Sequence, residues 1–247
     1  MTTDVTLRLR YPRRRTIRAV LSKLSRWAFE CLADLEIVGQ ENLPKDGPLI
    51  VVANHFFAVD PALMIGIAPW PMEFLSAQHV VSGPQWLHLF PILWGVITVA
   101  RGSVASRLAL RAAEAVLQQD GVLGIYPEAG AWSRILRPPR PGTAFIAVRS
   151  RARLLPVGVD GVPNIFKALL KGKRARVTVR IGQPFGPYQV SGSGRERRQQ
   201  LEDVGHDIMR HIAALLPAES RGYYGDDPAM RERALAEAEY PERALDG

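Results

Sequence analysis

The sequence predicts an α/β protein in which a β-sheet is covered by helices and preceded by an amphipathic helix. Short β-type runs alternate with longer helical patterns along most of the 247 residues, and this alternation is typical of a sheet with helices on its faces. The composition, with 47% hydrophobic and 23% charged residues, is that of an ordinary globular protein. A chain of this length can bury a sizeable core as one large domain with an appendage.

The first predicted element is a helix from Arg14 to Leu32. Its apolar residues recur every three or four positions, which places them on one face. A basic amphipathic helix with a tryptophan is typical of a segment that lies on a membrane surface; the alternative is a terminal helix that packs on the domain. The apolar face holds Ile17, Val20, Leu21, Leu24, Trp27, Ala28 and Cys31, and the predicted membrane-surface residues are Arg14, Arg15, Arg18, Lys23, Arg26 and Trp27.

The remaining elements follow in order. A Gly/Ser segment at 191–194 separates the last long helix from the rest of the domain, and the polar residues after 218 predict a surface helix or a partly disordered tail. We therefore expect a helix at 1–33, a main domain at 34–217 and a polar tail at 218–247. The β-type runs are 35–38, 49–53, 72–77, 97–100, 122–126, 154–159 and 175–181, and the clearest helical patterns are 103–119, 143–151 and 195–216.

Charge and cysteine content restrict the partners and the compartment. The net charge is +8, and a basic N-terminal end predicts an anionic partner, either nucleic acid or acidic lipid. The single cysteine, Cys31, excludes an intrachain disulfide and suits a reducing compartment. Neither a secretory leader nor an apolar run of membrane-spanning length is evident, so we expect the protein to lie on a membrane instead of crossing it.

His55 and Asp60 lie where a predicted strand gives way to a predicted helix. Purely structural roles would suit both, because Asp at the N-cap and Pro61 at the first helical position favour a helix start. In a straight helix the two side chains would point about 140° apart, so they can meet only if His55 lies in the turn before the helix. The carboxylate would then fix the imidazole tautomer, and the other ring nitrogen could accept a proton from an attacking hydroxyl.

Three further junctions of a strand or loop with a helix carry charged residues. They contain Arg101, Glu128 and Arg140, and each alone could be an ordinary surface residue. Arginine binds oxyanions through two parallel hydrogen bonds, and a helix N-terminus favours the same negative charge. Their order along the chain is informative, because ligands of α/β sheets bind at the edge where strands meet helices.

This order of motifs resembles the lysophosphatidic acid acyltransferase family, also called the 1-acylglycerol-3-phosphate acyltransferases, over about residues 35–217. Asn54-His55 to Asp60-Pro61 matches the N-H-x-x-x-x-D-P signature of the first block. The other blocks are matched by Gly95 to Gly102, by Tyr126-Pro127-Glu128 and by Leu155-Pro156-Val157.

The resemblance implies a mixed, largely parallel sheet and a division of roles among the matched residues. It makes His55 the catalytic base and Asp60 its partner. It places Arg101, Glu128, Gly130 and Arg140 at the lipid acceptor, and Pro156 and Val157 at the acyl pocket.

The third block departs from the family pattern F-P-E-G-T-R-S. Ala129 stands in place of the glycine, and Ala131, followed by Trp132, stands in place of the phosphate-binding arginine. Arg134 or Arg137 could substitute if the loop is rearranged. The missing arginine affects the expected identity of the acceptor more than the expected acyl-transfer reaction. A lysophospholipid with another head group, or a glycolipid, is therefore an alternative acceptor.

The function implied by the resemblance is transfer of an acyl chain from a thioester, on coenzyme A or acyl carrier protein, to the hydroxyl of a lysophospholipid. It requires no metal and no redox cofactor. We expect a peripheral protein on the inner, cytoplasmic face of the cell membrane, bound to anionic lipid and not to nucleic acid. A serine hydrolase is disfavoured because the chain has no G-x-S-x-G motif, whereas a non-catalytic lipid-binding protein stays an alternative. The sequence does not indicate an oligomeric state.

Overall fold

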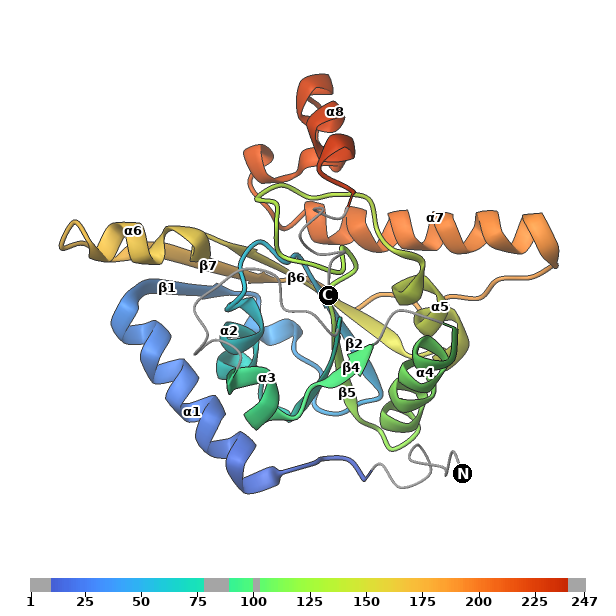
Figure 1. The fold of residues 1–247 in the computed structure, drawn as a ribbon, viewed down its shortest axis with the longest axis horizontal. Helices are drawn as coiled ribbons and strands as arrows, with labels where there is room; N and C mark the ends of the chain where they lie inside the picture. Colours follow the sequence, from blue (N-terminus) through green and yellow to red (C-terminus); the bar gives the residue numbers. More distant parts are fainter. Residues whose placement is uncertain (1–9, 78–88, 100–102, 240–247) are drawn as a thin grey trace.

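The computed structural model describes residues 10–77, 89–99 and 103–239 of the chain. Within these residues, seven strands form one sheet in the order β1-β7-β6-β2-β5-β3-β4 (Figure 1). All neighbouring strands are parallel except β6 and β7, which are antiparallel. The predicted mixed, largely parallel sheet is therefore confirmed. The strands are β1 (Ala33–Val38), β2 (Leu49–Ala53), β3 (Met72–Ala77), β4 (Ile97–Val99), β5 (Val122–Ile125), β6 (Arg153–Asp160) and β7 (Ala175–Ile181).

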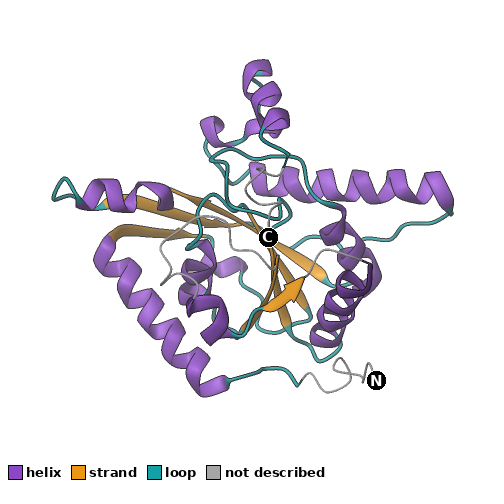
Figure 2. Cartoon of the chain, viewed as in Figure 1, coloured by secondary structure: helices purple, strands orange, loops and turns teal. Residues whose placement is uncertain are grey.

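Helices cover both faces of this sheet (Figure 2). Helices α1 and α2 contribute to the core on one face, and α4, α5 and α7 contribute to the core on the other. The sheet is thus the middle layer of three, as expected for strands alternating with helices. The helices are α1 (Arg15–Leu32), α2 (Asp60–Ile67), α3 (Leu89–Trp94), α4 (Ser103–Leu117), α5 (Pro141–Ser150), α6 (Ile165–Leu169), α7 (Gly194–Ala213) and α8 (Pro228–Ala236).

Strand β2 lies in the middle of the sheet and is buried along its whole length. Successive side chains of a strand point to opposite faces. Accordingly, Leu49, Val51 and Ala53 join the core beneath α1 and α2, whereas Ile50 and Val52 join the core beneath α4, α5 and α7. The continuous apolar run that identified this strand in the sequence reflects burial on both faces.

Helix α1 packs on the domain through a side that combines polar residues with the buried Phe29. Arg18 is 1% exposed, and Ser25 Oγ donates a hydrogen bond of 2.5 Å to the carbonyl of Ala62 in α2. The two helices approach closely at Gly66, where an added Cβ would lie 2.9 Å from the backbone nitrogen of Arg26. A side chain at position 66 would therefore push α1 away from α2.

The other side of α1 carries large apolar residues and faces outward. Its large side chains stay exposed on the surface of the described structure, although exposed apolar surface is unfavourable in water. The exposed fractions are 49% for Ile17, 60% for Val20, 54% for Leu24 and 62% for Trp27.

Arg18 does not play the membrane-surface role that the sequence predicted for it, whereas that role stays a prediction for the exposed Arg14. Arg18 is buried in an ion pair with Glu73 of β3, and the exposed Arg14 donates hydrogen bonds to the backbone of α3. Periodicity placed Arg18 on the polar face correctly but could not show that this face is the one packed on the domain. Arg15, Lys23, Arg26 and Trp27 are exposed, as predicted.

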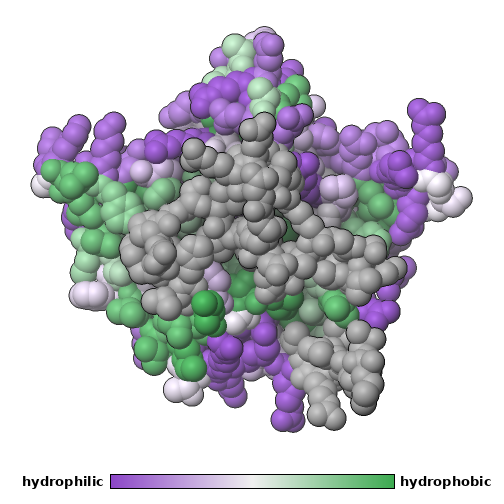
Figure 3. All heavy atoms as spheres, viewed as in Figure 1, coloured by the Kyte–Doolittle hydropathy of each residue, from purple (hydrophilic) through white to green (hydrophobic). Residues whose placement is uncertain are grey.

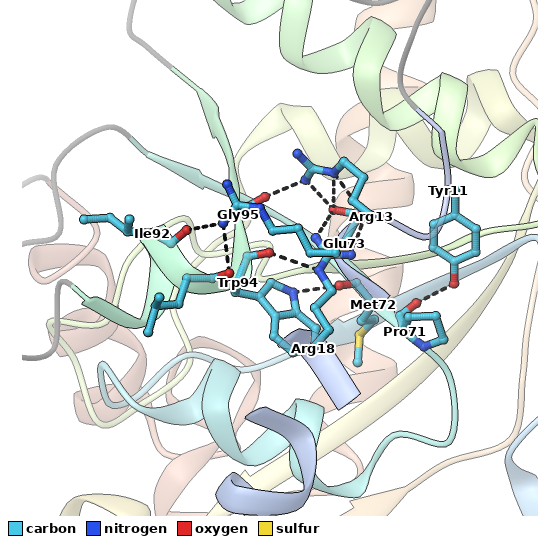
Figure 4. A network of polar contacts seen from close by, with 11 residues as sticks. Tyr11, Arg13, Arg18, Pro71, Met72, Glu73, Ile92, Trp94 and Gly95 are labelled. Carbon is cyan, nitrogen blue, oxygen red and sulfur yellow. Dashed lines mark hydrogen bonds and ion pairs between the residues drawn. The ribbon is translucent and has the colours of Figure 1, made fainter. Parts of the chain in front are cut away.

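A buried carboxylate on β3 holds the N-terminal segment (Figure 4). The side chain of Glu73 is 0% exposed, and it accepts hydrogen bonds of 2.5 and 2.7 Å from the guanidinium of Arg18. Arg13 adds a further bond of 2.5 Å. Burial alone would raise the pKa of the Glu73 carboxyl, but the hydrogen bonds and charges of the two arginines outweigh burial and lower it. Both partners come from residues 13–18, so removing that segment would leave a buried charge uncompensated.

The end of the described chain also packs on the domain. Two 3₁₀ turns, Ala218–Ser220 and Gly222–Tyr224, precede α8, in agreement with the predicted surface helix. Leu136 donates a backbone hydrogen bond to Ser220 and accepts one from Tyr223. No helix in the described part of the chain is long and apolar enough to span a membrane.

We predict that Glu73→Gln lowers the free energy of unfolding by about 3 kcal/mol at neutral pH, because Arg18 is left buried without a charged partner. The folded state lowers the pKa of Glu73, so its stabilising contribution is complete above the ordinary value of 4.5 and is lost as the pH falls through the folded-state pKa. Urea denaturation of both proteins at neutral and acidic pH should show the difference shrinking in acid.

Glu36→Gln is the matched control, because Glu36 forms an exposed ion pair with Arg176. Exposed pairs contribute little to stability. Equal destabilisation by the two substitutions would contradict the importance of the buried pair.

Candidate active site

The candidate site lies at the carboxyl end of β2, between its neighbours β5 and β6. The strand ends at Ala53, and the chain turns through Asn54 and His55 before α2 begins at Asp60. Parallel neighbours bring the ends of β5 and β6 to the same edge. The first, third and fourth sequence blocks therefore meet there, as the order of motifs predicted.

His55 and Asp60 are in contact. His55 Nδ1 lies 3.1 Å from Asp60 Oδ2, and the histidine side chain is 16% exposed whereas the aspartate is 1% exposed. A carboxylate can only accept hydrogen bonds, so Nδ1 carries the proton in the neutral ring. This leaves Nε2 with a lone pair, which can accept a proton from a hydroxyl.

Asp60 is not the N-cap that the sequence suggested. It is the first residue of α2, and Val59 occupies the cap position. Its Oδ2 instead accepts hydrogen bonds of 2.8 Å from the backbone nitrogens of Phe56 and Phe57. The carboxylate therefore folds the turn back on itself, and this brings His55 within reach.

Asn54 fixes the start of the same turn and was given no role in the sequence analysis. Its side-chain amide donates to the carbonyl of Val159 and accepts from the backbone nitrogen of the same residue, both at 2.8 Å. The buried amide thus pairs with β6 as a further peptide unit would. Only the adjacency of Asn54 to His55 could have suggested this role, because its partner is 105 residues away.

Tyr126, at the end of β5, supports the imidazole from one face. The two rings are stacked with centroids 4.2 Å apart. Burial raises the pKa of Tyr126 well above its ordinary value of 10.0, and the charge of Asp60 adds to the increase. Among the described residues, no hydrogen-bond partner is found for Tyr126 Oη or for Asp60 Oδ1. The hydroxyl is therefore buried in its neutral form and finds no compensating partner among the residues that the structure describes.

Glu128 supports the turn from a second direction. Its Oε1 accepts a hydrogen bond of 3.2 Å from the backbone nitrogen of His55, and its Oε2 accepts one of 3.1 Å from that of Arg137. Burial raises the pKa of this carboxyl, although the charge of Arg137 opposes the increase. The carboxylate points into the protein, so its contact with an acceptor stays a prediction.

Arg137 does not fit the role of an accessible substitute for the missing motif arginine. Its side chain is 2% exposed and lies 3.3 Å from Glu128 Oε2. It also donates a hydrogen bond to the carbonyl of Gly130, and its guanidinium lies 3.9 Å from the centre of the Trp132 ring. Arg134, by contrast, is exposed. The loop therefore uses Arg137 internally, as the partner of Glu128.

The C-terminal segment contacts the same loop. Trp132 Nε1 donates to the carbonyl of Glu237 at 2.9 Å, and Arg140 Nη2 donates to the carbonyl of Ala238 at 2.6 Å. Arg140 is the N-cap residue of α5, as its position before Pro141 suggested. Its predicted contact with the acceptor stays a prediction.

Of the remaining predicted residues, two lie beside the His55 turn and one is not described. Pro156 and Val157 lie on β6 and pair with Val52 and Ala53 of β2, directly beside the His55 turn. Arg101 lies outside the described residues. No group of three histidine, cysteine, aspartate or glutamate side chains within the described ranges could hold a metal ion.

We predict that Tyr126→Phe raises the free energy of unfolding by about 1 kcal/mol, because it removes a buried hydroxyl that has no partner. Phenylalanine keeps the ring stacked on His55, so any activity should be retained. Chemical denaturation gives the stability change.

Tyr188→Phe is the control of opposite sign, because the Tyr188 hydroxyl donates to the carboxylate of Asp207 and its loss should destabilise the fold. A loss of stability in Tyr126→Phe would mean that its hydroxyl does have a partner.

Comparisons with known proteins find similarity to acyltransferases. The family model described as Acyltransferase matches residues 34–160. The 1-acyl-sn-glycerol-3-phosphate acyltransferase of Borreliella burgdorferi is 30% identical over 151 residues, which are 58% of this chain and 57% of that protein. An uncharacterized protein of Mycobacterium tuberculosis is 25% identical over 176 residues, which are 68% of this chain and 48% of that protein.

A solved structure is also similar. The crystal structure of the 1-acyl-sn-glycerophosphate (LPA) acyltransferase of Thermotoga maritima has a TM-score of 0.54 and 25% identity, covering 82% of this chain and 83% of that one. The alignments span 57% and 48% of the curated relatives, so less than two thirds of either is represented. The family model nevertheless covers more than half of this chain and includes the His55–Asp60 pair, Glu128 and β6. The chain therefore belongs to the Acyltransferase family.

Proposed function

We propose that this protein transfers an acyl chain from a thioester to the hydroxyl of a lysophospholipid, and that 1-acylglycerol-3-phosphate is the acceptor and phosphatidic acid the product. The observation that carries the proposal is the pairing of His55 Nδ1 with buried Asp60 at 3.1 Å. This pairing leaves Nε2 of a partly exposed imidazole ready to accept a proton. The names of the relatives in Borreliella burgdorferi and Thermotoga maritima support the choice of acceptor.

In the proposed reaction, the acceptor hydroxyl loses its proton to His55 Nε2 as its oxygen attacks the thioester carbonyl. Asp60 stabilises the resulting imidazolium. The tetrahedral intermediate then collapses, the carbon–sulfur bond breaks, and the leaving thiolate takes the proton from His55. Coenzyme A and acyl carrier protein are both suitable carriers of the thiol, and neither a metal nor a redox cofactor is needed for these steps.

A different acceptor is the second candidate, and the third sequence block favours it. Ala131 replaces the family arginine, and Arg137 is buried against Glu128. Among the arginines proposed to replace it, the exposed one is Arg134. A lysophospholipid with another head group, or a glycolipid, would need less positive charge from this loop.

We further propose that the protein lies on the inner, cytoplasmic face of the cell membrane, where its acceptor resides. The outward apolar side of α1 supports this location, because it exposes Trp27 and three large aliphatic side chains to solvent. Arg15 and Lys23 are exposed on the same helix and would attract anionic lipid.

We expect His55→Ala to reduce turnover by a factor of about 100 or more, because general-base catalysis contributes about 10²–10⁴-fold. The assay is thioester consumption by the purified full chain with acyl-CoA and lysophosphatidic acid, repeated with acyl carrier protein as the carrier. His211→Ala is the control, because His211 lies on α7 and stacks on Phe185 away from the dyad. Acceptor-dependent turnover that survives in His55→Ala would refute the proposed base, and no turnover with either donor would favour a lipid-binding protein.

Asp60→Asn should reduce kcat by a similar or larger factor, because a neutral amide cannot stabilise the imidazolium. The amide oxygen can still accept the backbone hydrogen bonds of Phe56 and Phe57, so the turn should remain folded. Circular dichroism and kinetics of the same preparation separate the two effects. Wild-type activity in a folded Asp60→Asn protein would leave Asp60 with a structural role alone.

Comparing lysophosphatidic acid with a monoacylglycerol and a lysophosphatidylinositol tests the acceptor. If the phosphate monoester is recognised, kcat/KM should be highest for lysophosphatidic acid. A preference for the inositol lipid would favour the second candidate while leaving the reaction class intact.

A further inference from the structure

Helix α3 exposes two large apolar side chains beside the N-terminal segment. Ile92 is 66% exposed and Leu93 is 45% exposed. The next residue, Trp94, is 1% exposed, and its Nε1 donates a hydrogen bond of 2.8 Å to the carbonyl of Met72. Trp94 therefore anchors the end of α3 in the protein, while Ile92 and Leu93 stay exposed on the surface.

Two arginines from the start of the described chain bind the last carbonyls of this helix, and a third binds the carbonyl that follows it. Arg14 donates to Ile92 at 2.6 Å and to Leu93 at 2.9 Å. Arg18 donates to Trp94 at 3.0 Å, as Figure 4 shows. The last carbonyls of a helix have no partner within it, and the negative end of the helix dipole favours cations there.

The third arginine completes this arrangement. Arg13 donates a hydrogen bond of 2.5 Å to the carbonyl of Gly95, directly after α3. Arg13 and Arg18 also pair with the buried Glu73. Separating α3 from the start of α1 would break these hydrogen bonds, while the pairs with Glu73 hold the same arginines on β3. The N-terminal segment therefore fixes α3 and the start of α1 relative to each other.

The apolar side of α1 begins at this junction. Ile17 lies between Arg14 and Arg18 in the sequence, is 49% exposed, and is followed along the outward side by Val20 and Leu24. Figure 3 shows hydrophobic surface over the region of α1 and α3. Exposed apolar side chains that gather on one surface mark an interaction site.

We propose that α1 and α3 form a single docking surface for an anionic bilayer, in which Ile92 and Leu93 insert beside the outward side of α1. The proposal rests on the proposed function only in that the acceptor is a membrane lipid. The basic side chains Arg15 and Lys23, exposed on α1, identify the occupant as an anionic lipid surface. Because the arginines hold α3 in place before contact, docking requires little ordering of the protein.

The test measures binding of the full chain to vesicles of equal parts phosphatidylcholine and phosphatidylglycerol, without substrate. The double substitution Ile92→Asp and Leu93→Asp should weaken binding at least about tenfold, because it removes two apolar side chains from the lipid interface and adds negative charge. Leu235→Asp is the matched control. Leu235 is 51% exposed on α8, far from α1 in Figure 1, and its substitution should leave binding unchanged.

A fluorescent label reports insertion directly and does not depend on the stability of the aspartate variants. In a Cys31→Ser background, Leu93→Cys labelled with an environment-sensitive dye should show a blue shift when vesicles are added, whereas Leu235→Cys should show none. Binding unchanged by the aspartates, or a label at position 93 that stays in water, would overturn the proposal.

Two further outcomes separate the docking surface from a dimer interface and from the proposed function. Dimerisation of the wild type that is lost in the aspartate variant, without vesicle binding, would assign the surface to a second copy of the chain and overturn the proposal. Vesicle binding by a protein that lacks acyl transfer would refute the proposed function and leave the docking surface intact.

Discussion

The candidate site depends on one buried oxygen, Oδ2 of Asp60. It accepts hydrogen bonds from two consecutive backbone nitrogens, those of Phe56 and Phe57, and it also contacts Nδ1 of His55. A buried carboxylate is costly unless such donors compensate it. The donors are available only when the chain turns sharply after β2, so the same contacts that stabilise the charge also position the imidazole. Structure and chemistry at this point have a common cause.

Other residues around this turn also restrict the position of the His55 imidazole. Asn54 ties the turn to β6, Glu128 ties it to the loop after β5, and the ring of Tyr126 covers one face of the histidine. These contacts come from the two strands that flank β2 in the sheet and from the loop that follows β5. An imidazole held in this way is already positioned before any ligand arrives, which is the usual advantage of a site built on rigid elements.

Much of the fold could be predicted from the sequence, because burial on both faces gives the central strands an uninterrupted apolar run. Strands β2, β3 and β7 have the predicted bounds. The orientation of α1 could not be predicted. Periodicity separates two faces of a helix, but the choice of the packed face depends on Glu73, which lies 55 residues after Arg18. Such long-range partners leave no local signal.

The candidate site, like the fold, could be predicted only where the signal is local. The spacing of His55 and Asp60 follows from a local turn, so the sequence could predict their contact. Asn54 and Arg137 were missed or misjudged for different reasons. The partner of Asn54 lies on β6, and Arg137 pairs with a carboxylate that the third block identifies without revealing its direction. In the loop after β5, the Arg137 guanidinium lies over the Trp132 ring, and residue types alone do not predict this arrangement.

The pairing of Asn54 with Val159 has a consequence for how the protein is made. The two residues are 105 positions apart, and closing so long a segment carries an entropy cost that must be met before the contact forms. During synthesis, His55 and Asp60 are translated long before β6, so no strand is yet present to receive the Asn54 amide. The turn that holds His55 and Asp60 can therefore reach its final geometry only after more than half of the chain has been translated. A truncated product would carry the motif without the contacts that hold it in place.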